Sequence, residues 1–144
     1  MSRTKDFEHR FVANAPRELE PGVLYISIEF ATALHQCACG CGSRIVTPFS
    51  PTDWRMSFDG RSVSLNPSIG NWSLPCRSHY FIRRGTVQWA GDWSEQMVLQ
   101  NRASDRSRKR PLEQASSVNN IESPAYRSHG SWFKRMQRWF LSKL

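Results

Sequence analysis

The segment His35-Gln-Cys-Ala-Cys-Gly-Cys-Gly42 places three cysteines within five residues, and the fold that we expect follows from it. The chain has four cysteines, and the remaining one, Cys76, lies far downstream. Thiols at this close spacing do not pair comfortably as disulfides, whereas zinc binds thiolates in a tetrahedron with bonds of about 2.3 Å. Gly40 and Gly42 let one tight turn present several sulfurs to one ion. The segment therefore predicts a metal-binding knuckle.

Six donors compete for the four positions of such a site, since His35 precedes the knuckle and His79 follows Cys76. We expect the four cysteines to bind one Zn²⁺ ion: Cys37, Cys39, Cys41 and Cys76. In the second choice of ligands, His79 replaces Cys37. A distant fourth ligand ties the knuckle to another strand, and a structural metal contributes on the order of 10 kcal/mol of folding free energy. Small buried cysteines and a two-iron redox centre are the alternatives.

Alternating apolar residues around the knuckle predict a mostly β fold. The stretch Val23–Phe30 alternates strictly, which predicts a half-buried strand with Tyr25 and Ser27 on its solvent side. Shorter strands are predicted over five ranges: 44–49, 54–58, 63–65, 78–82 and 86–89. Turn formers predict a type I′ hairpin at Asp59-Gly60, a second hairpin at Arg83-Arg84-Gly85 and a loop over residues 66–75. The expected fold is a small zinc-stapled antiparallel β domain of zinc-ribbon-like hairpins, with a C-terminal amphipathic helix.

The composition divides the chain into four parts: an N-terminal arm (1–20), a zinc-binding β domain (21–95), a basic flexible linker (96–130) and an amphipathic helix (131–144). Residues 1–100 carry a net charge of only +1 out of the total of +8, so the basic character belongs to the tail. The last helix places aromatic residues beside Lys and Arg. We expect it to dock in a partner's groove, with an anionic membrane surface as the alternative.

The sequence contains no apolar run of the roughly 20 residues that a membrane-spanning helix needs. Its N-terminus also lacks the apolar segment of a secretory signal. We therefore expect a cytoplasmic location, where thiols stay reduced and available to a metal. The basic run Arg102–Arg110 is typical of a solvated linker. A nucleic-acid-binding zinc protein whose basic tail neutralises phosphates is a further alternative function, and we favour nucleic acid less than protein as the partner.

Four blocks of the β domain resemble a bacterial family of small cysteine-rich, metal-binding proteins described as a domain of unknown function. The blocks are Cys37–Gly42, Val63–Trp72, Cys76–Ile82 and Gly85–Trp89, and the likeness covers about residues 23–90. Many members have proline where this chain has Ala38. Genes of that family stand beside those for ubiquitin-like modifiers and for their activating and conjugating enzymes. The resemblance implies a role in protein conjugation, with the modifier and these enzymes as partners.

Two functions follow from the resemblance. We expect a zinc-binding accessory component that recognises the modifier, the conjugating enzyme or the target. The alternative is a small peptidase that processes or removes the modifier with Ser78 and His79 near the metal, because hydroxyl and imidazole are parts of acyl-transfer chemistry. Adjacent strand residues point to opposite faces, so these two do not pair easily. Nothing in the sequence selects a carboxylate partner among Asp53, Asp59 and Asp92.

Overall fold

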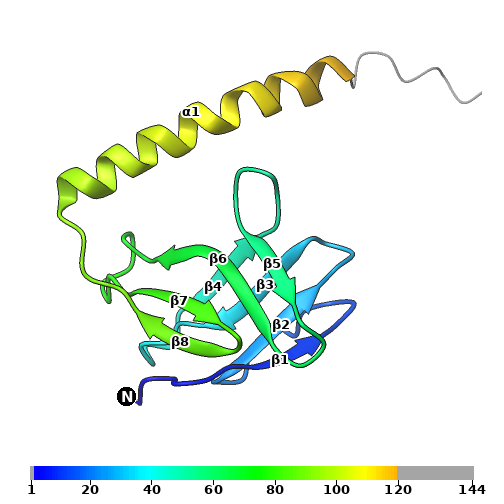
Figure 1. Cartoon of the computed structure of the whole chain (residues 1–144), viewed down its shortest axis with the longest axis vertical. Helices are drawn as coiled ribbons and strands as arrows, with labels where there is room; N and C mark the ends of the chain where they lie inside the picture. Colours follow the sequence, from blue (N-terminus) through cyan, green and yellow to red (C-terminus); the bar gives the residue numbers. More distant parts are fainter. Residues whose placement is uncertain (1, 120–144) are drawn as a thin grey trace, which may run out of the picture. The chain divides into compact units, whose positions relative to one another are not determined.

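A computed structural model describes residues 2–119 of the chain as eight strands and one helix (Figure 1). The strands are β1 (Glu8–Phe11), β2 (Val23–Ser27), β3 (Thr32–Gln36), β4 (Arg44–Pro48), β5 (Arg55–Phe58), β6 (Val63–Gly70), β7 (His79–Arg83) and β8 (Thr86–Trp89). They are followed by the helix α1 (Glu95–Asn119). The β domain and the first turns of α1, up to Lys109, form one compact unit. The mostly β class predicted from the sequence is confirmed.

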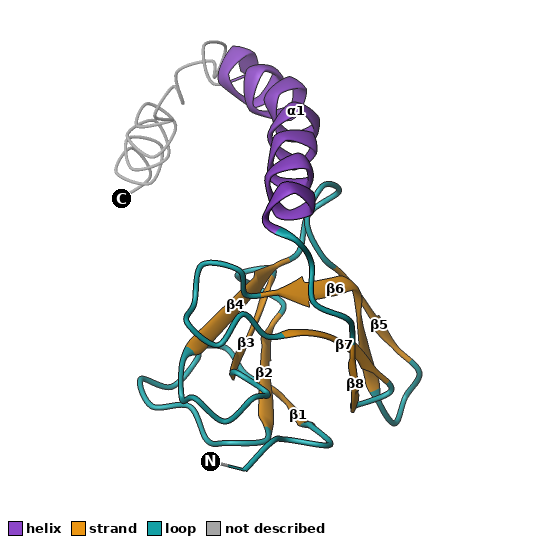
Figure 2. Ribbon diagram, turned by 90° about the vertical axis from the view of Figure 1, so that its left-hand side faces the viewer, coloured by secondary structure: helices purple, strands orange, loops and turns teal. Residues whose placement is uncertain are grey.

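The strands form two four-stranded sheets, in the orders β1-β2-β3-β4 and β5-β6-β7-β8. Only β1 and β2 run parallel among these strands, and every other pair is antiparallel. The two sheets face each other across one core, to which Leu24 and Ile26 contribute from the first sheet and Ile69 and Ile82 from the second (Figure 2). Burying the inner face of each sheet against the other removes both apolar surfaces from water.

The strand predicted over Val23–Phe30 is shorter and more deeply buried than the alternation indicates. It ends at Ser27, where the chain turns and returns as β3, a strand that the sequence analysis missed. Ile28 and Phe30 therefore lie in the turn and are exposed. Tyr25 is buried instead of solvated, because the segment before β2 covers the outer face of the sheet with apolar residues such as Leu19.

The N-terminal arm predicted over residues 1–20 contributes a strand of its own. Its residues 8–11 form β1, which pairs in parallel with β2, starting at Glu8 opposite Val23. Further upstream, the backbone N–H of Val87 donates to the carbonyl oxygen of Lys5, so the arm also meets β8 of the second sheet. The arm thus connects the two sheets along one side of the core.

Both predicted hairpins are present, with different turns. Residues 84 and 85 join β7 to β8 and both have positive φ, as a type I′ turn requires. The Asp59-Gly60 turn takes four residues instead of the two of a type I′ turn, since Phe58 pairs with Val63. The Asp59 carboxylate accepts the backbone N–H groups of Arg61 and Ser62, which stabilises the longer loop.

The loop predicted over residues 66–75 is partly strand, because β6 continues to Gly70. Leu65 pairs with Ile82 and Ile69 pairs with Tyr80, so three residues of β6 face one residue of β7. Such a bulge bends a strand and redirects its side chains. Pro67, which has no backbone N–H to give to a ladder, lies inside this bulge.

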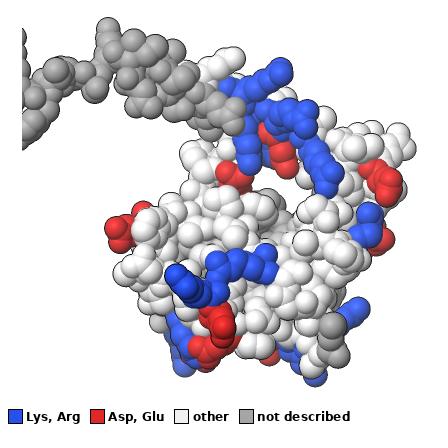
Figure 3. Space-filling model, turned by 180° about the vertical axis from the view of Figure 1, so that it is seen from behind, with Lys and Arg blue, Asp and Glu red and all other residues white. Residues whose placement is uncertain are grey.

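The flexible linker predicted over residues 96–130 is helical in its described part. The side chain of Ser94 accepts the backbone N–H of Met97 as an N-cap. The low apolar content that suggested a linker does not oppose a helix, because Arg, Lys, Gln and Glu are strong helix formers. Figure 3 shows basic side chains gathered along α1, whereas both signs are scattered over the sheets in this view.

The amphipathic helix predicted over residues 131–144 lies outside the described residues, so its expected contacts stay predictions. Within residues 2–119, no helix is both long enough and apolar enough to cross a membrane.

Candidate functional site

The four cysteines lie together in space, although they come from two distant parts of the chain. Their Sγ atoms all fall within 4.8 Å of one another. The first three belong to the connection between β3 and β4, and Cys76 belongs to the connection between β6 and β7. Gly40 and Gly42 have positive φ and fold the knuckle so that its sulfurs converge. One ion held here would join a turn of the first sheet to a turn of the second.

The distances fit a thiolate-bound metal. Cys37 Sγ lies 3.4 Å from Cys39 Sγ and 3.9 Å from Cys76 Sγ, and all four thiols are free of disulfides. Four sulfurs around a tetrahedral zinc are about 3.8 Å apart when each bond is about 2.3 Å. The four cysteines can therefore hold a metal ion.

Polar side chains surround the most buried of these thiols. The Ser78 hydroxyl lies 3.0 Å from Cys37 Sγ. The side-chain amide nitrogen of Asn71 donates a hydrogen bond to Ser78 Oγ at 2.8 Å. The same nitrogen also contacts Cys37 Sγ, at 3.7 Å. All three residues are buried. Hydrogen bonds of this kind orient a metal ligand and stabilise its negative charge.

The protonation of the thiols depends on their surroundings. Burial raises the pKa of Cys37, and it raises the pKa of Cys39 to about 12. The pKa of Cys41 falls to about 6, mainly because the Ser43 hydroxyl donates to its thiolate. A metal ion has to displace protons from the first two thiols, so binding at this cluster releases protons and weakens as the pH falls.

Neither histidine of the six candidate donors belongs to the cysteine cluster. His35 is fully buried, and its Nε2 lies 2.8 Å from the Tyr80 hydroxyl. Burial lowers the pKa of His35 to about 3, so this imidazole is neutral. His79 points away from the cysteines, to the outer face of the second sheet.

His79 is held between a serine hydroxyl and a backbone carbonyl. Its Nε2 lies 2.9 Å from Ser68 Oγ, and its Nδ1 lies 2.9 Å from the carbonyl oxygen of Gly91. A carbonyl oxygen can only accept a hydrogen bond, so Nδ1 carries the proton. Nε2 is then free to accept the proton of the Ser68 hydroxyl. A serine whose proton is accepted by an oriented imidazole is the arrangement of an activated nucleophile.

The bulge in β6 makes this contact, because it turns Ser68 to the outer face opposite His79. Ser68 is half-buried, whereas the side chain of His79 is only slightly exposed. Both residues line a cavity of about 730 Å³, together with Trp72 and Trp93. The hydroxyl and the imidazole are therefore accessible to a substrate in this cavity.

Two tryptophans enclose the imidazole. The rings of Trp72 and Trp93 stack 5.5 Å apart, and their centroids lie 5.0 and 5.1 Å from that of His79. Gly70 makes room for this arrangement, because a Cβ atom there would lie 2.4 Å from Nε1 of Trp72. Aromatic walls keep the imidazole in place and exclude water from one side of it.

Ser78 and His79, the residues proposed from the sequence for catalysis, point to opposite sides. Ser78 lies with Cys37, and His79 lies with Ser68. This separation follows the strand alternation expected from the sequence. Ser68 is not among the site residues predicted from the sequence, because it lies in the stretch predicted to be a loop. One signal in the sequence could have found Ser68. It stands beside a proline, between strand residues, and the strand that faces it carries a histidine.

None of the three aspartates that are candidate partners of the imidazole orients it. Asp59 caps its own turn, Asp53 pairs with Lys109 at 2.5 Å, and Asp92 lies 3.8 Å from Arg77. Hydrogen bonds from Lys109 and Ser50 hold the pKa of Asp53 below its usual value despite burial, which acts in the opposite direction. In the described residues, the Gly91 carbonyl takes the place that a carboxylate has in a triad.

Comparisons with known proteins identify one family. No curated protein and no solved structure matches the chain. The model of one family, the bacterial ubiquitination-like system serine protease (BubE), matches residues 11–90, which is more than half of the chain. The match includes the four cysteines, Ser68 and His79, and it confirms the link to bacterial ubiquitin-like systems that the sequence blocks predicted. The chain therefore belongs to the BubE family of bacterial ubiquitination-like system serine proteases.

Proposed function

We propose that this protein is a serine peptidase that cleaves the bond following a ubiquitin-like modifier, either to process the modifier or to remove it from a target. Ser68 is the nucleophile and His79 is the general base. The observation that carries the proposal is the 2.9 Å contact between Ser68 Oγ and His79 Nε2, with Nδ1 held by the Gly91 carbonyl. The family description, a serine protease, supports the same chemistry.

The reaction follows from these contacts. Ser68 Oγ attacks the carbonyl carbon of the scissile bond while its proton passes to Nε2 of His79. The imidazolium then donates that proton to the nitrogen of the leaving amine, and the C–N bond breaks to leave an ester on Ser68. A water molecule, deprotonated by His79, attacks the ester, and the proton returns to Ser68 Oγ as the product acid leaves.

The Gly91 carbonyl has a definite part in this cycle. It keeps the proton on Nδ1, so that Nε2 faces the hydroxyl in its basic form. Its partial negative charge also stabilises the imidazolium, although less than the full charge of a carboxylate would. We therefore expect slower turnover than in an enzyme with a Ser-His-Asp triad.

We also propose that a metal bound by the four cysteines has a structural role and that the ion is zinc. Four thiolates fill a tetrahedron and leave no position for a water molecule, which is the property of structural zinc sites. Bound there, zinc supplies a cross-link between the two sheets. Asn71 and Ser78 keep Cys37 oriented toward it.

An accessory role is the second candidate, as expected from the sequence. In that role the protein recognises the modifier, or its activating or conjugating enzymes, and cleaves nothing. The observation that favours it is the group that accepts the hydrogen bond of His79 Nδ1, which is the Gly91 carbonyl and not a carboxylate within residues 2–119. The two candidates share their partners and differ in hydrolysis.

The test is cleavage of a conjugate of a bacterial ubiquitin-like modifier, followed by gel electrophoresis and mass spectrometry. We expect Ser68→Ala and His79→Gln each to lower the rate by about a thousandfold or more. Ser57→Ala, on the exposed side of β5, is the matched control and should cleave at the wild-type rate. Wild-type cleavage by Ser68→Ala would refute the assignment. No cleavage by the wild type, together with a stable complex with the modifier, would favour the accessory role.

A further inference from the structure

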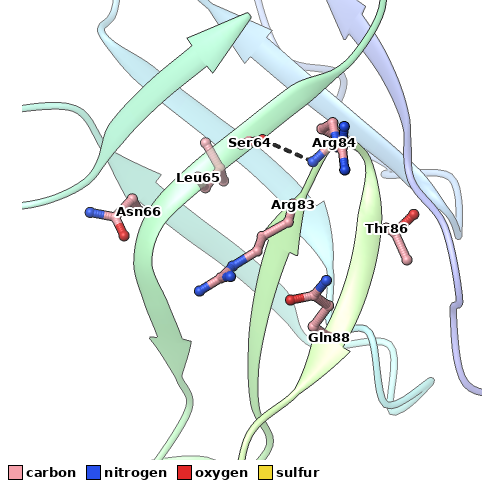
Figure 4. A pocket seen from close by; sticks show the side chains of 7 residues that line it. All are labelled: Ser64, Leu65, Asn66, Arg83, Arg84, Thr86 and Gln88. Atoms are coloured by element: carbon pink, nitrogen blue, oxygen red, sulfur yellow. Dashed lines mark hydrogen bonds between the residues drawn. The ribbon is translucent and has the colours of Figure 1, made fainter.

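A second cavity, of about 550 Å³, lies on the same sheet as the Ser68–His79 pair (Figure 4). Arg83 and Arg84 line it at the turn between β7 and β8, and Thr86 and Gln88 of β8 close one side. On the other side lies β6, with Asn66. The cavity is open to solvent, and we refer to it as the arginine groove.

The arginine groove carries positive charge and many donors. Its lining includes two guanidinium groups and no carboxylate. Arg10 and Arg77 have carboxylate partners elsewhere in the domain, whereas no ion pair of Arg83 or Arg84 occurs within residues 2–119. Asp6 accepts a hydrogen bond from the hydroxyl of Thr86, which lines the groove, and it forms no ion pair with a guanidinium within residues 2–119. The groove is therefore complementary to a negatively charged group.

Arg83 is also directed along the sheet toward the reactive residues. Its Cζ lies 4.8 Å from the ring of Phe81, and that ring lies 6.3 Å from the ring of His79. Asn66 lines both the arginine groove and the cavity that holds Ser68. The guanidinium is thus separated from the imidazole by one aromatic ring, a distance that an extended peptide covers in about three residues.

We propose that the arginine groove binds an acidic side chain of the substrate polypeptide, about three residues from the bond that Ser68 attacks. The inference rests on the proposed peptidase function and adds a substrate preference to it. A carboxylate forms two parallel hydrogen bonds with a guanidinium, which fixes position as well as charge. An extended chain lying over β6 and β7 then has its scissile bond at Ser68 when its acidic residue meets Arg83.

The experiment measures binding and not cleavage, so it stays informative if the chain cleaves nothing. Full-length Ser68→Ala protein is titrated against fluorescein-labelled octapeptides of alanine, serine and glycine that carry one Glu, Gln or Lys, and anisotropy is recorded. We expect the Glu peptide to bind about tenfold more tightly than the Gln peptide. Adding Arg83→Gln should remove that difference. Arg61→Gln, on the turn between β5 and β6 of the same sheet, is the matched control and should preserve it.

Three results would overturn the inference: equal affinity for the Glu and Gln peptides, a preference for Glu that survives Arg83→Gln, or an equal loss in Arg61→Gln. The last would mean that overall charge attracts the peptide. Arg83→Glu should remove the Glu preference and raise the affinity for the Lys peptide, since a carboxylate then stands where the guanidinium of Arg83 was. If the Glu preference holds while the conjugate assay shows no hydrolysis, the peptidase proposal fails and the acid-binding groove stands.

Discussion

The cysteine cluster and the Ser68–His79 pair lie on opposite sides of the same short stretch of backbone. At the end of β6, Asn71 points to the cysteines and Trp72 points to His79. At the start of β7, Ser78 points to Cys37 and His79 points to Ser68. Neighbouring residues are thus divided between two sites. An interaction that holds this backbone in place at the cysteines therefore also holds it in place at the Ser68–His79 pair.

The two regions differ in what holds them. The cysteine cluster bridges both sheets, with Cys37 buried and the other three cysteines partly buried, so an ion there stabilises the whole domain. The Ser68–His79 pair lies within one sheet, lines a cavity and depends on a bulge and two tryptophan rings. Under the proposed function, the first region provides stability and the second carries out the chemistry. Substitutions that affect one region alone can test this division.

Removal of the metal should have the largest effect, and it should affect both regions. We expect chelation, or Cys76→Ser, to cost on the order of 10 kcal/mol of folding free energy, which is comparable to the stability of a whole domain. Elemental analysis, thermal unfolding with and without chelator, and tryptophan fluorescence measure this. Added zinc should restore the chelated protein but not the variant. A native protein without bound metal, or an unchanged melting temperature after chelation, would remove the basis of the cross-link.

Gly70→Ala should affect the reactive pair and spare the cysteine cluster. The new Cβ would lie 2.4 Å from Nε1 of Trp72, a contact that forces the indole away from His79. Overpacking of this kind costs about 1 to 3 kcal/mol. We expect cleavage to fall at least tenfold while metal content stays at the wild-type level.

The additional variant Trp72→Ala provides the control for Gly70→Ala, because it removes the ring that the new methyl group meets. In the Trp72→Ala background, Gly70→Ala should have no further effect on cleavage or unfolding. An equal effect in both backgrounds would show that the glycine matters for another reason.

The cysteine cluster was largely predictable from the sequence, because its signal is local and chemically rare. Three cysteines with two glycines in one short segment have few other uses, and Cys76 was the only sulfur left to complete the set. The structure brings those four sulfurs together, as predicted. The sequence could not show that His35 would be enclosed in the core beside Tyr80, since burial depends on strands paired far along the chain.

The contact between Ser68 and His79 was only half predictable. His79 was a candidate from the sequence, and its catalytic role stays a prediction, whereas Ser68 is one of many serines, and its position depends on a bulge that alternation does not reveal. The short strand β3 was missed for a related reason, since the turn after Ser27 interrupts an apolar pattern that continues in the sequence. The helix α1 was missed because its residues favour a helix through backbone propensity and carry little apolar signal.

Ser78→Ala should show the opposite pattern to Gly70→Ala. It removes the hydroxyl that contacts Cys37 Sγ and leaves the Asn71 amide without its 2.8 Å acceptor. The loss of such a partner lowers metal affinity by about 10- to 100-fold. Competition with a chelator measures that affinity. At saturating zinc, cleavage should stay near the wild-type rate; a loss as large as that of Ser68→Ala would return the nucleophile to Ser78.

Asp59→Ala should have the smallest effect and should leave both regions unchanged, because the turn from Asp59 to Ser62 lies at the far end of β6. Hydrogen bonds from the backbone of Arg61, then of Ser62, lower the pKa of Asp59 to about 2, against about 3.9 in an unfolded chain. The unfolded state therefore takes up a proton first as the pH falls. The contribution of this carboxylate to stability is complete above about pH 4 and is lost toward pH 2.

The Asp59→Ala variant should melt a few degrees lower than the wild type at pH 7, and its melting temperature should decline less between pH 4 and pH 2. If its melting temperature fell as steeply as that of the wild type over this interval, the protons would be bound elsewhere, and the cysteine thiolates, whose metal is released by acid, would be the next groups to test.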